Sequence, residues 1–114
     1  MQEAAVRRLR KRAEFVRTAR GNRVGRSAFS LQCAARDLEE PGLGFTVTKQ
    51  QGNSPERNRI RRRLRAAAEA CSGDFQTRHD YVLIGRREAL GIDFARLVAE
   101  LSSSLNKIHA RNPR

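Results

Sequence analysis

Apolar residues recur along the chain with two different periods, one typical of helices and one typical of strands. The helical period comes first, because apolar side chains return every three or four positions in residues 4–20. These positions are Val6, Leu9, Ala13 and Val16. The pattern predicts a first amphipathic helix over 4–20, with its many basic side chains outward and its end at the glycine of "RGN".

Two segments with a period of two follow this helix. Over 28–34, large apolar residues alternate with small or polar ones, which predicts a half-buried strand. The segment "GFTVTK", residues 44–49, alternates in the same way and is rich in β-branched residues. Between them, "DLEEPGLG" is acidic and contains proline and glycine, as turns do. We therefore expect a hairpin between these two strands.

A second helix is predicted to begin at Ser54. This residue can cap the helix, Pro55 suits the first helical position, and Glu56 complements the helix dipole. One apolar stripe follows at helical spacing until Gly73 closes the helix. The stripe consists of Ile60, Leu64, Ala67, Ala68 and Cys71.

The rest of the chain predicts one more strand and one more helix. The segment "DYVLIG", residues 80–85, is almost continuously apolar, which indicates a central strand covered on both faces. Asp93 can cap a last helix, in which apolar residues keep the helical period as far as Ile108 without a miss. Since 114 residues leave no room for a second core, we expect one domain over 1–114. We expect its ends, 1–8 and 109–114, to fray.

Charge suggests the kind of partner. The chain has 24 basic against 12 acidic residues, a net charge of +12. Such a charge favours a polyanion, because neutralising a nucleic acid releases its condensed counterions. No stretch approaches the roughly 20 apolar residues of a membrane-spanning helix, and the basic start lacks the apolar run of a secretory signal. We expect a cytoplasmic protein with no membrane partner.

Residues able to carry catalysis are scattered. A metal-dependent nuclease needs clustered carboxylates, and general base catalysis needs a positioned histidine. The acidic candidates lie where turns, strand starts and helix caps are predicted, and they are Glu39, Glu40, Asp74, Asp80 and Asp93. His79 and His109 have no companions at metal-ligand spacing, and Cys33 and Cys71 have no CxxC partner. We expect neither a catalytic residue nor a metal site on the protein.

The stretch "GNSPERNRIRRRLR", residues 52–65, is the most unusual one. Six arginines fall among the nine residues 57–65, and Glu56 is the only acid in the stretch. Like charges one helical turn apart cost a few tenths of a kcal/mol per pair, so another interaction must offset them. Guanidinium forks match phosphate geometry, and Asn58 can meet a base edge or a 2′-hydroxyl. The stretch predicts a nucleic-acid-binding helix.

The segment "ERNRIRRRLR" resembles the RNR signature of the bacterial ribonuclease P protein component. Three other stretches are similar to that family in the same order: "LRKRAEF" to its first helix, "GLGFTVTK" to the strand before the signature, and "DYVLIGRREAL" to the strand and arginine turn after it. The resemblance implies an α+β fold, a single-domain α/β sandwich of order αβββαβα similar to ribosomal protein S5 domain 2. It also implies a left-handed β-α-β crossover and a short strand over 23–26 that periodicity does not indicate.

The resemblance also implies a function. In that family a large RNA subunit, with metal-bound water, hydrolyses the bond that joins the 5′ leader to tRNA, and the protein assists. The implied partners are ribonuclease P RNA and precursor tRNA, with Mg²⁺ held by the RNA subunit and substrate and with the isolated protein monomeric. Two alternatives remain open: a ribosomal or general RNA-binding protein without a role in cleavage, and an autonomous nuclease.

Site residues follow from the resemblance position by position. The residues expected to contact or shape the surface for the RNA subunit are Arg57, Asn58, Arg59, Arg61, Arg62, Arg65, Gly52 and Asn53. The leader would pass between the first helix and the sheet, at Phe15 and Lys49. Positions that are often aromatic in the family carry Ala19 and Gln32, and Gln50 replaces a second lysine. Stacking on an aromatic ring is worth about 1–3 kcal/mol per base, so we expect weakened leader contacts.

Overall fold

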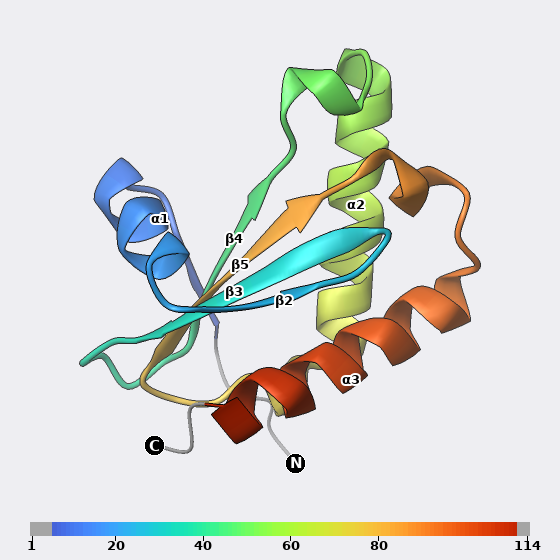
Figure 1. Cartoon of the computed structure of the whole chain (residues 1–114). Helices are drawn as coiled ribbons and strands as arrows, with labels where there is room; N and C mark the ends of the chain where they lie inside the picture. The colour runs from blue at the N-terminus through green and yellow to red at the C-terminus, as the bar shows by residue number, and fades with distance from the viewer. Residues whose placement is uncertain (1–5, 112–114) are drawn as a thin grey trace.

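The computed structural model describes residues 6–111 and places three α-helices around a five-stranded sheet within that range (Figure 1). The strands are β1 (Arg7–Arg8), β2 (Asn22–Gly25), β3 (Phe29–Ala35), β4 (Gly42–Thr46) and β5 (His79–Gly85). The α-helices are α1 (Arg12–Ala19), α2 (Ser54–Ala70) and α3 (Phe94–Arg111). Short 3-10 helices are η1 (Lys49–Gln51), η2 (Ser72–Asp74) and η3 (Arg87–Leu90). The expected αβββαβα order is confirmed, with β1 as an added strand at its start.

The sheet has the strand order β1-β4-β5-β3-β2. β4 and β5 are parallel neighbours joined through α2, while β3 runs antiparallel to both β5 and β2. α2 and α3 cover one face, and α1 lies against the other (Figure 1). Contacts at two glycines distinguish the two faces. A Cβ at Gly44 would meet Phe15 of α1, whereas one at Gly85 would meet Ile60 and Leu64 of α2. The parallel unit β4-α2-β5 is the expected β-α-β crossover, and its left-handedness stays a prediction.

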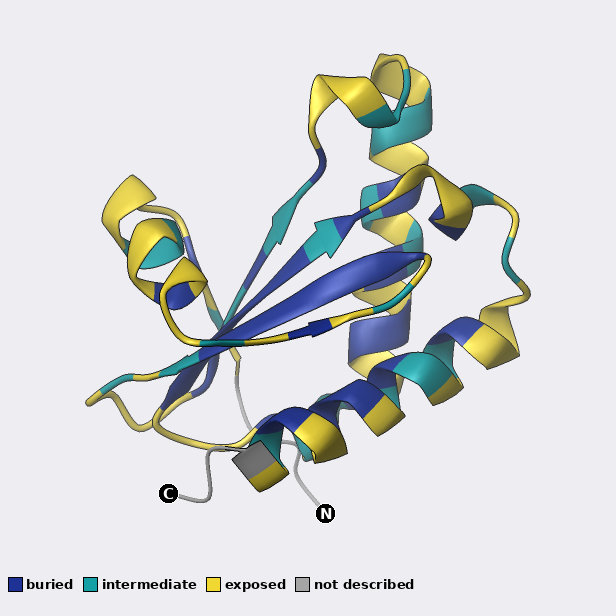
Figure 2. Cartoon of the chain, viewed as in Figure 1, coloured by how far each residue is buried: buried dark blue, intermediate teal, exposed yellow. Residues whose placement is uncertain are grey.

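The predicted hairpin between β3 and β4 is wrong, because β5 lies between them and pairs with both. The apolar run of β5 needs cover on both faces and neighbours on both edges, and a local turn pattern carries no information about such a distant partner. The expectation of a half-buried β3 is also wrong. Ser30 and Gln32, on its second face, are only 2% and 6% exposed. Figure 2 shows most of β3 as buried.

The predicted first helix over 4–20 is wrong in its first half. Within the described residues the helix begins only at Arg12, after an N-cap at Lys11, where the Glu14 carboxylate accepts the N–H groups of Arg10 and Lys11 at 3.0 and 3.1 Å. The preceding residues join the sheet, since the N–H of Arg7 donates to the Pro41 carbonyl at 2.7 Å. The helical period was fortuitous, because three of its four positions, Val6, Ala13 and Val16, are exposed.

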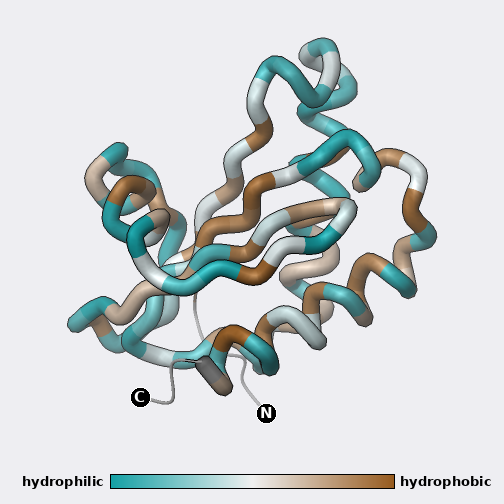
Figure 3. Tube along the Cα trace, in the orientation of Figure 1, coloured by the Kyte–Doolittle hydropathy of each residue, from teal (hydrophilic) through white to brown (hydrophobic). Residues whose placement is uncertain are grey.

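The two remaining helices follow their predicted apolar patterns. Every residue of the α2 stripe is buried, from Ile60 to Cys71, and the inward residues of α3 form the other half of this core. Figure 3 shows hydrophobic segments along β5 and at intervals along α3. The cap of α2 is Asn53 instead of Ser54, because its Oδ1 accepts the Glu56 N–H at 2.9 Å. α2 ends at Ala70, before the predicted Gly73.

The two chain ends and the extra strand also bear on the sequence predictions. β2 confirms the short strand implied near residues 23–26. Of the ends expected to fray, residues 7–8 form β1 and residues 109–111 belong to α3, whereas 1–5 and 112–114 lie outside the described residues. Within residues 6–111, none of the helices has the length and apolar content needed to cross a membrane.

Candidate nucleic-acid interface

The first half of α2 presents a set of basic side chains that we call the α2 arginine surface. It consists of Arg57, Arg59, Arg61, Arg62 and Arg65, together with Asn58. Arg59, Arg62 and Arg65 are exposed, as is Asn58, and the other two are half-buried (Figure 2). Among the described residues, none of these five arginines has a carboxylate within 4.0 Å. Their charge is therefore left for a partner to neutralise.

Several of these arginines are oriented by neutral groups. Arg57 donates to the Gly52 carbonyl at 2.9 Å and to the Ser54 hydroxyl at 3.2 Å. Arg61 donates to the Asn58 side-chain oxygen at 3.1 Å. Such contacts hold a guanidinium in place without cancelling its charge, which reduces the entropy lost when an anion binds.

Two arginines of α2 have further structural contacts: Arg63, which the sequence prediction did not assign to RNA, and Arg65, which it did. Arg63 turns inward and donates to the Ile92 carbonyl, which fixes α2 against the segment before α3. Arg65 lies over the Phe45 ring, with its Cζ 5.5 Å from the ring centre, and this cation-π contact fixes its direction while leaving it exposed.

The loop before α2 is held by a residue that the sequence prediction missed. Arg87, which follows β5, donates to both Glu56 carboxylate oxygens at 3.0 and 2.9 Å and, through its N–H, to Gln51 Oε1 at 2.9 Å. Arg87 and the Asn53 N–H lower the pKa of Glu56 to about 2. The only acid in the arginine stretch is thus tied to the fold. The sequence signal for Arg87 was its position directly after β5, because the end of β5 lies beside the start of α2 in a β-α-β unit.

Gly52 is required by this arrangement. Its φ of 152° falls in a region that other residues rarely adopt, and a Cβ there would lie 2.6 Å from Glu56 Oε1. Asn53 then caps α2 through its side-chain oxygen, and its own N–H donates the reciprocal bond to Glu56 Oε1 at 2.9 Å. Both residues therefore shape the start of the helix, and direct contact of either with RNA stays a prediction.

The four residues expected near the leader lie on three elements. Phe15 is half-buried on α1 and packs its ring on Gly44 of β4. Lys49 is exposed in η1, just past the other end of β4, and Ala19 is exposed at the last residue of α1. Gln32 lies in β3 opposite Val82 and is nearly buried, so it offers little surface to a nucleotide. Their role toward the leader stays a prediction.

Asp80, weighed as a catalytic acid, lies in an ion-pair cluster beneath α1. Its side chain is fully buried, and it accepts from Arg7 at 2.5 Å and from Arg36 at 2.7 Å, with Arg17 at 3.6 Å. Glu14 completes the cluster through Arg36 at 3.4 Å. Because each Asp80 carboxylate oxygen faces at least one guanidinium, Asp80 serves to join β1, α1 and β5.

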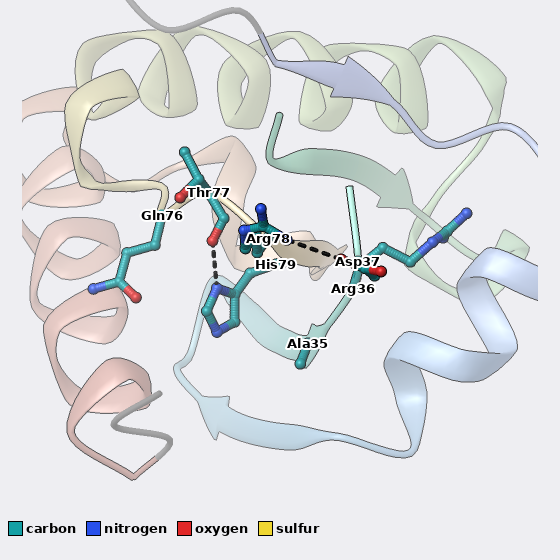
Figure 4. A pocket seen from close by; sticks show the side chains of 7 residues that line it. All are labelled: Ala35, Arg36, Asp37, Gln76, Thr77, Arg78 and His79. Atoms are coloured by element: carbon teal, nitrogen blue, oxygen red, sulfur yellow. Dashed lines mark hydrogen bonds and ion pairs between the residues drawn. The ribbon is translucent and has the colours of Figure 1, made fainter. Parts of the chain in front are cut away.

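The histidines are likewise occupied by packing. His109 Nε2 lies 2.8 Å from the Tyr81 hydroxyl, and burial lowers the pKa of His109. His79 Nδ1 lies 2.9 Å from the Thr77 carbonyl, on the wall of a hollow of about 620 Å³ (Figure 4). Asp37, on the same wall, is paired with Arg78 at 2.8 Å. No histidine in residues 6–111 is bonded to a carboxylate, so a general-base pair is not formed there.

Comparison with known proteins bears on the identity of this arginine-bearing fold. The family model described as Ribonuclease P matches residues 4–109. The chain belongs to the ribonuclease P protein family. The ribonuclease P protein component of Gluconacetobacter diazotrophicus is 45% identical over 107 residues, covering 91% of this chain and 92% of the relative. That of Brucella suis is 42% identical over 105 residues, covering 83% and 74%.

A solved structure shares the fold of this ribonuclease P family member. The RNase P protein of Thermotoga maritima superposes with a TM-score of 0.75 at 22% identity, covering 88% of this chain and 96% of that one. The resemblance drawn from "ERNRIRRRLR" and its flanking stretches is thereby confirmed. Membership makes the chain a protein component of ribonuclease P, which processes tRNA, and implies ribonuclease P RNA as its partner.

Proposed function

We propose that this chain binds ribonuclease P RNA through the α2 arginine surface and assists removal of the 5′ leader from precursor tRNA. The observation that carries this proposal is the set of five arginines on α2 that have no carboxylate within 4.0 Å among residues 6–111. A protein under no demand to bind a polyanion gains nothing from such a set, because like charges on one helix repel. Counterion release on binding RNA offsets that repulsion.

The chemistry belongs to the RNA subunit in this proposal. Arginines or backbone N–H groups bind the carboxylates of Asp80, Glu14 and Glu56. These carboxylates are therefore poor ligands for Mg²⁺. No group of three or more potential ligands that could hold a metal is found in residues 6–111. We propose that Mg²⁺ is held by the RNA subunit and the substrate, and that the protein, a monomer by itself, supplies positive charge and position.

The 5′ leader passes along α1 and the adjoining sheet face. Phe15 supplies an aromatic side chain on α1, and Lys49 supplies an exposed cation in η1. Ala19 cannot stack on a base, and Gln32 is nearly buried. Leader binding is consequently weak relative to binding of the RNA subunit, since each missing stacking contact removes about 1–3 kcal/mol.

The decisive test removes charge from the α2 arginine surface. The double variant Arg59→Ala, Arg62→Ala should reduce the slope of log affinity for ribonuclease P RNA against log salt by roughly 1.4–1.8, from 0.7–0.9 per phosphate contact. Thermal unfolding should change little, because both side chains are exposed. The matched control, Arg96→Ala with Lys107→Ala, removes the same charge from exposed positions of α3 and should leave the slope unchanged. Equal slope changes in the two variants would contradict the proposed interface.

A cleavage assay separates this function from the alternatives. The protein is mixed with ribonuclease P RNA and precursor tRNA at low Mg²⁺, and 5′ maturation is followed. Stimulation by the wild type but not by the α2 variant is expected. Binding without stimulation would instead indicate a general RNA-binding protein, and cleavage by the protein without the RNA subunit would indicate an autonomous nuclease.

A further inference from the structure

A small hollow lies at the outer edge of β4, where the residues before α1 approach α2. Its volume is about 160 Å³. The lining residues that matter here are Arg8, Phe15, Gly44, Phe45, Arg61 and Arg65. The hollow thus joins the α2 arginine surface to Phe15, the aromatic residue of α1. Arg8 is the one basic residue of the lining that belongs to neither predicted contact set.

The edge of β4 is open at this hollow. β1 pairs with β4 only at Gly42 and Leu43, with the Leu9 N–H donating to the Leu43 carbonyl at 3.1 Å just beyond. Main-chain groups of alternate residues point to the same side of a strand, so Phe45 presents its N–H at the edge that Leu43 presents. No strand of the described chain lies beside β4 at that point.

Positive charge converges on the hollow from two sides. Arg8 comes from β1, and Arg61 and Arg65 come from α2. None of the three has a carboxylate within 4.0 Å among residues 6–111. Three guanidinium groups around one hollow repel each other, and an anion between them would turn that repulsion into attraction.

The dimensions select the kind of anion. Sites for small organic ligands measure roughly 300–1000 Å³, which exceeds this hollow. A phosphate group is smaller, and guanidinium forks match its oxygens. The Phe15 and Phe45 rings add apolar walls suited to a sugar or base on either side of a phosphate. The hollow therefore has the donors and the size for one phosphate of a nucleic-acid backbone, with no room for a whole cofactor.

We propose that this hollow at the β4 edge binds one phosphate of an RNA backbone that passes between α2 and α1, with Arg8 as a direct contact. The inference rests on the proposed RNA-binding function and extends it to a residue outside the arginine helix. The phosphate can belong to the RNA subunit or to the precursor leader, and the experiment below distinguishes the two sources.

The test compares Arg8→Ala with Arg10→Ala, a neighbouring exposed arginine that does not line the hollow. In the first arm, affinity for ribonuclease P RNA alone is measured against salt. In the second arm, the assembled holoenzyme binds precursor tRNA or mature tRNA, which lacks the leader. Arg8→Ala should reduce the salt slope by roughly 0.7–0.9, the value for one phosphate, while Arg10→Ala should not.

Each outcome has one meaning. Loss of slope in the first arm assigns the phosphate to the RNA subunit, and loss confined to precursor tRNA in the second arm assigns it to the leader. Equal behaviour of Arg8→Ala and Arg10→Ala in both arms overturns the inference. Arg8→Lys, which keeps the charge, should retain the slope and guards against a loss caused by disturbed folding of β1, as does the urea midpoint of each variant.

The double variant Arg59→Ala, Arg62→Ala separates this inference from the proposed function. If it weakens RNA binding while Arg8 behaves like Arg10, the hollow is not a phosphate site and the function stands. If neither it nor Arg8→Ala alters binding, and the wild type does not stimulate maturation, the proposed function fails as well.

Discussion

Two groups of arginines on this fold use the same side chain in opposite ways. Beneath α1, the Asp80 cluster pairs three arginines with Asp80 and Glu14, and every guanidinium in it has a carboxylate within 4.0 Å. On α2, the arginine surface has five arginines and no carboxylate at that distance among the described residues. The net charge of +12 is therefore not spread evenly over the molecule.

The difference shows that an arginine's role is decided by where the acids lie. Arg7, Arg17 and Arg36 come from three separate segments and meet one buried carboxylate, so they connect the fold. On α2 the acid of the arginine stretch, Glu56, is paired with Arg87 from outside the helix. The arginines of the Asp80 cluster are thus neutralised and connect elements of the fold. Those of the α2 arginine surface remain charged and available to a partner.

The largest expected effect comes from disrupting the Asp80 cluster. Asp80→Asn leaves Arg7 and Arg36 facing a neutral amide in a buried position. Removal of one partner from a buried ion pair costs about 3–5 kcal/mol, so the free energy of unfolding in urea should fall by that amount. RNA affinity, measured at a temperature where the variant is still folded, should be unchanged, because the α2 arginine surface is untouched.

The matched control for this variant is Asp37→Asn. Asp37 is also paired with an arginine, Arg78 at 2.8 Å, but its side chain is 97% exposed. Exposed pairs contribute little in water, and the urea midpoint should barely move. Equal destabilisation by the two variants would show that burial of Asp80 does not matter, and the contrast between the two arginine groups would lose its basis.

Sequence alone predicted α2 well and the Asp80 cluster not at all. The α2 stripe and the outward arginines repeat within one helix, so a local period is sufficient to find them. Asp80 was placed correctly at the start of a buried strand, but its partners are 44 and 73 residues away. No local pattern reports a contact of that kind.

The errors in strand pairing have the same physical origin. β5 enters between β3 and β4 because its apolar residues are buried from both faces, which only the folded sheet reveals. In the same way, the helical period over residues 4–20 gave no sign that Arg7 and Arg8 pair with β4. The arginine-bearing helix was predicted because its pattern lies within one segment, and Arg87 was missed because it reaches α2 from another element.

An intermediate effect is expected from Gly52→Ala, which tests whether the loop before α2 positions the α2 arginine surface. The alanine would have to adopt a φ of 152° and its Cβ would press on Glu56 and Arg87. Backbone strain of this kind costs on the order of 1–3 kcal/mol, and the urea midpoint should fall accordingly. RNA affinity should also fall, without a change in salt slope, since no arginine is removed.

Gly91→Ala provides the control for that substitution. Its φ is −111°, and a Cβ there would meet nothing within 4 Å, so neither stability nor RNA affinity should change much. If Gly52→Ala behaved like Gly91→Ala, the loop before α2 would not be needed to set the start of the arginine surface.

The smallest effect is a pH dependence contributed by Glu14 of the Asp80 cluster. The N–H groups of Arg10 and Lys11, and then Arg36, hold the pKa of Glu14 below its ordinary value of 4.5. A carboxyl whose pKa is lower in the folded state stabilises the fold above its unfolded pKa, and that contribution disappears as the pH falls through the folded pKa. Stability should thus fall below about pH 4.5 in the wild type.

Glu14→Gln should remove that part of the acid dependence. The variant should be slightly less stable than the wild type at pH 7, and the two urea midpoints should converge as the pH is lowered below 4.5. Glu69→Gln, at an exposed position of α2, should run parallel to the wild type throughout. Parallel curves for Glu14→Gln and the wild type would mean that Glu14 contributes nothing to the acid dependence of the fold.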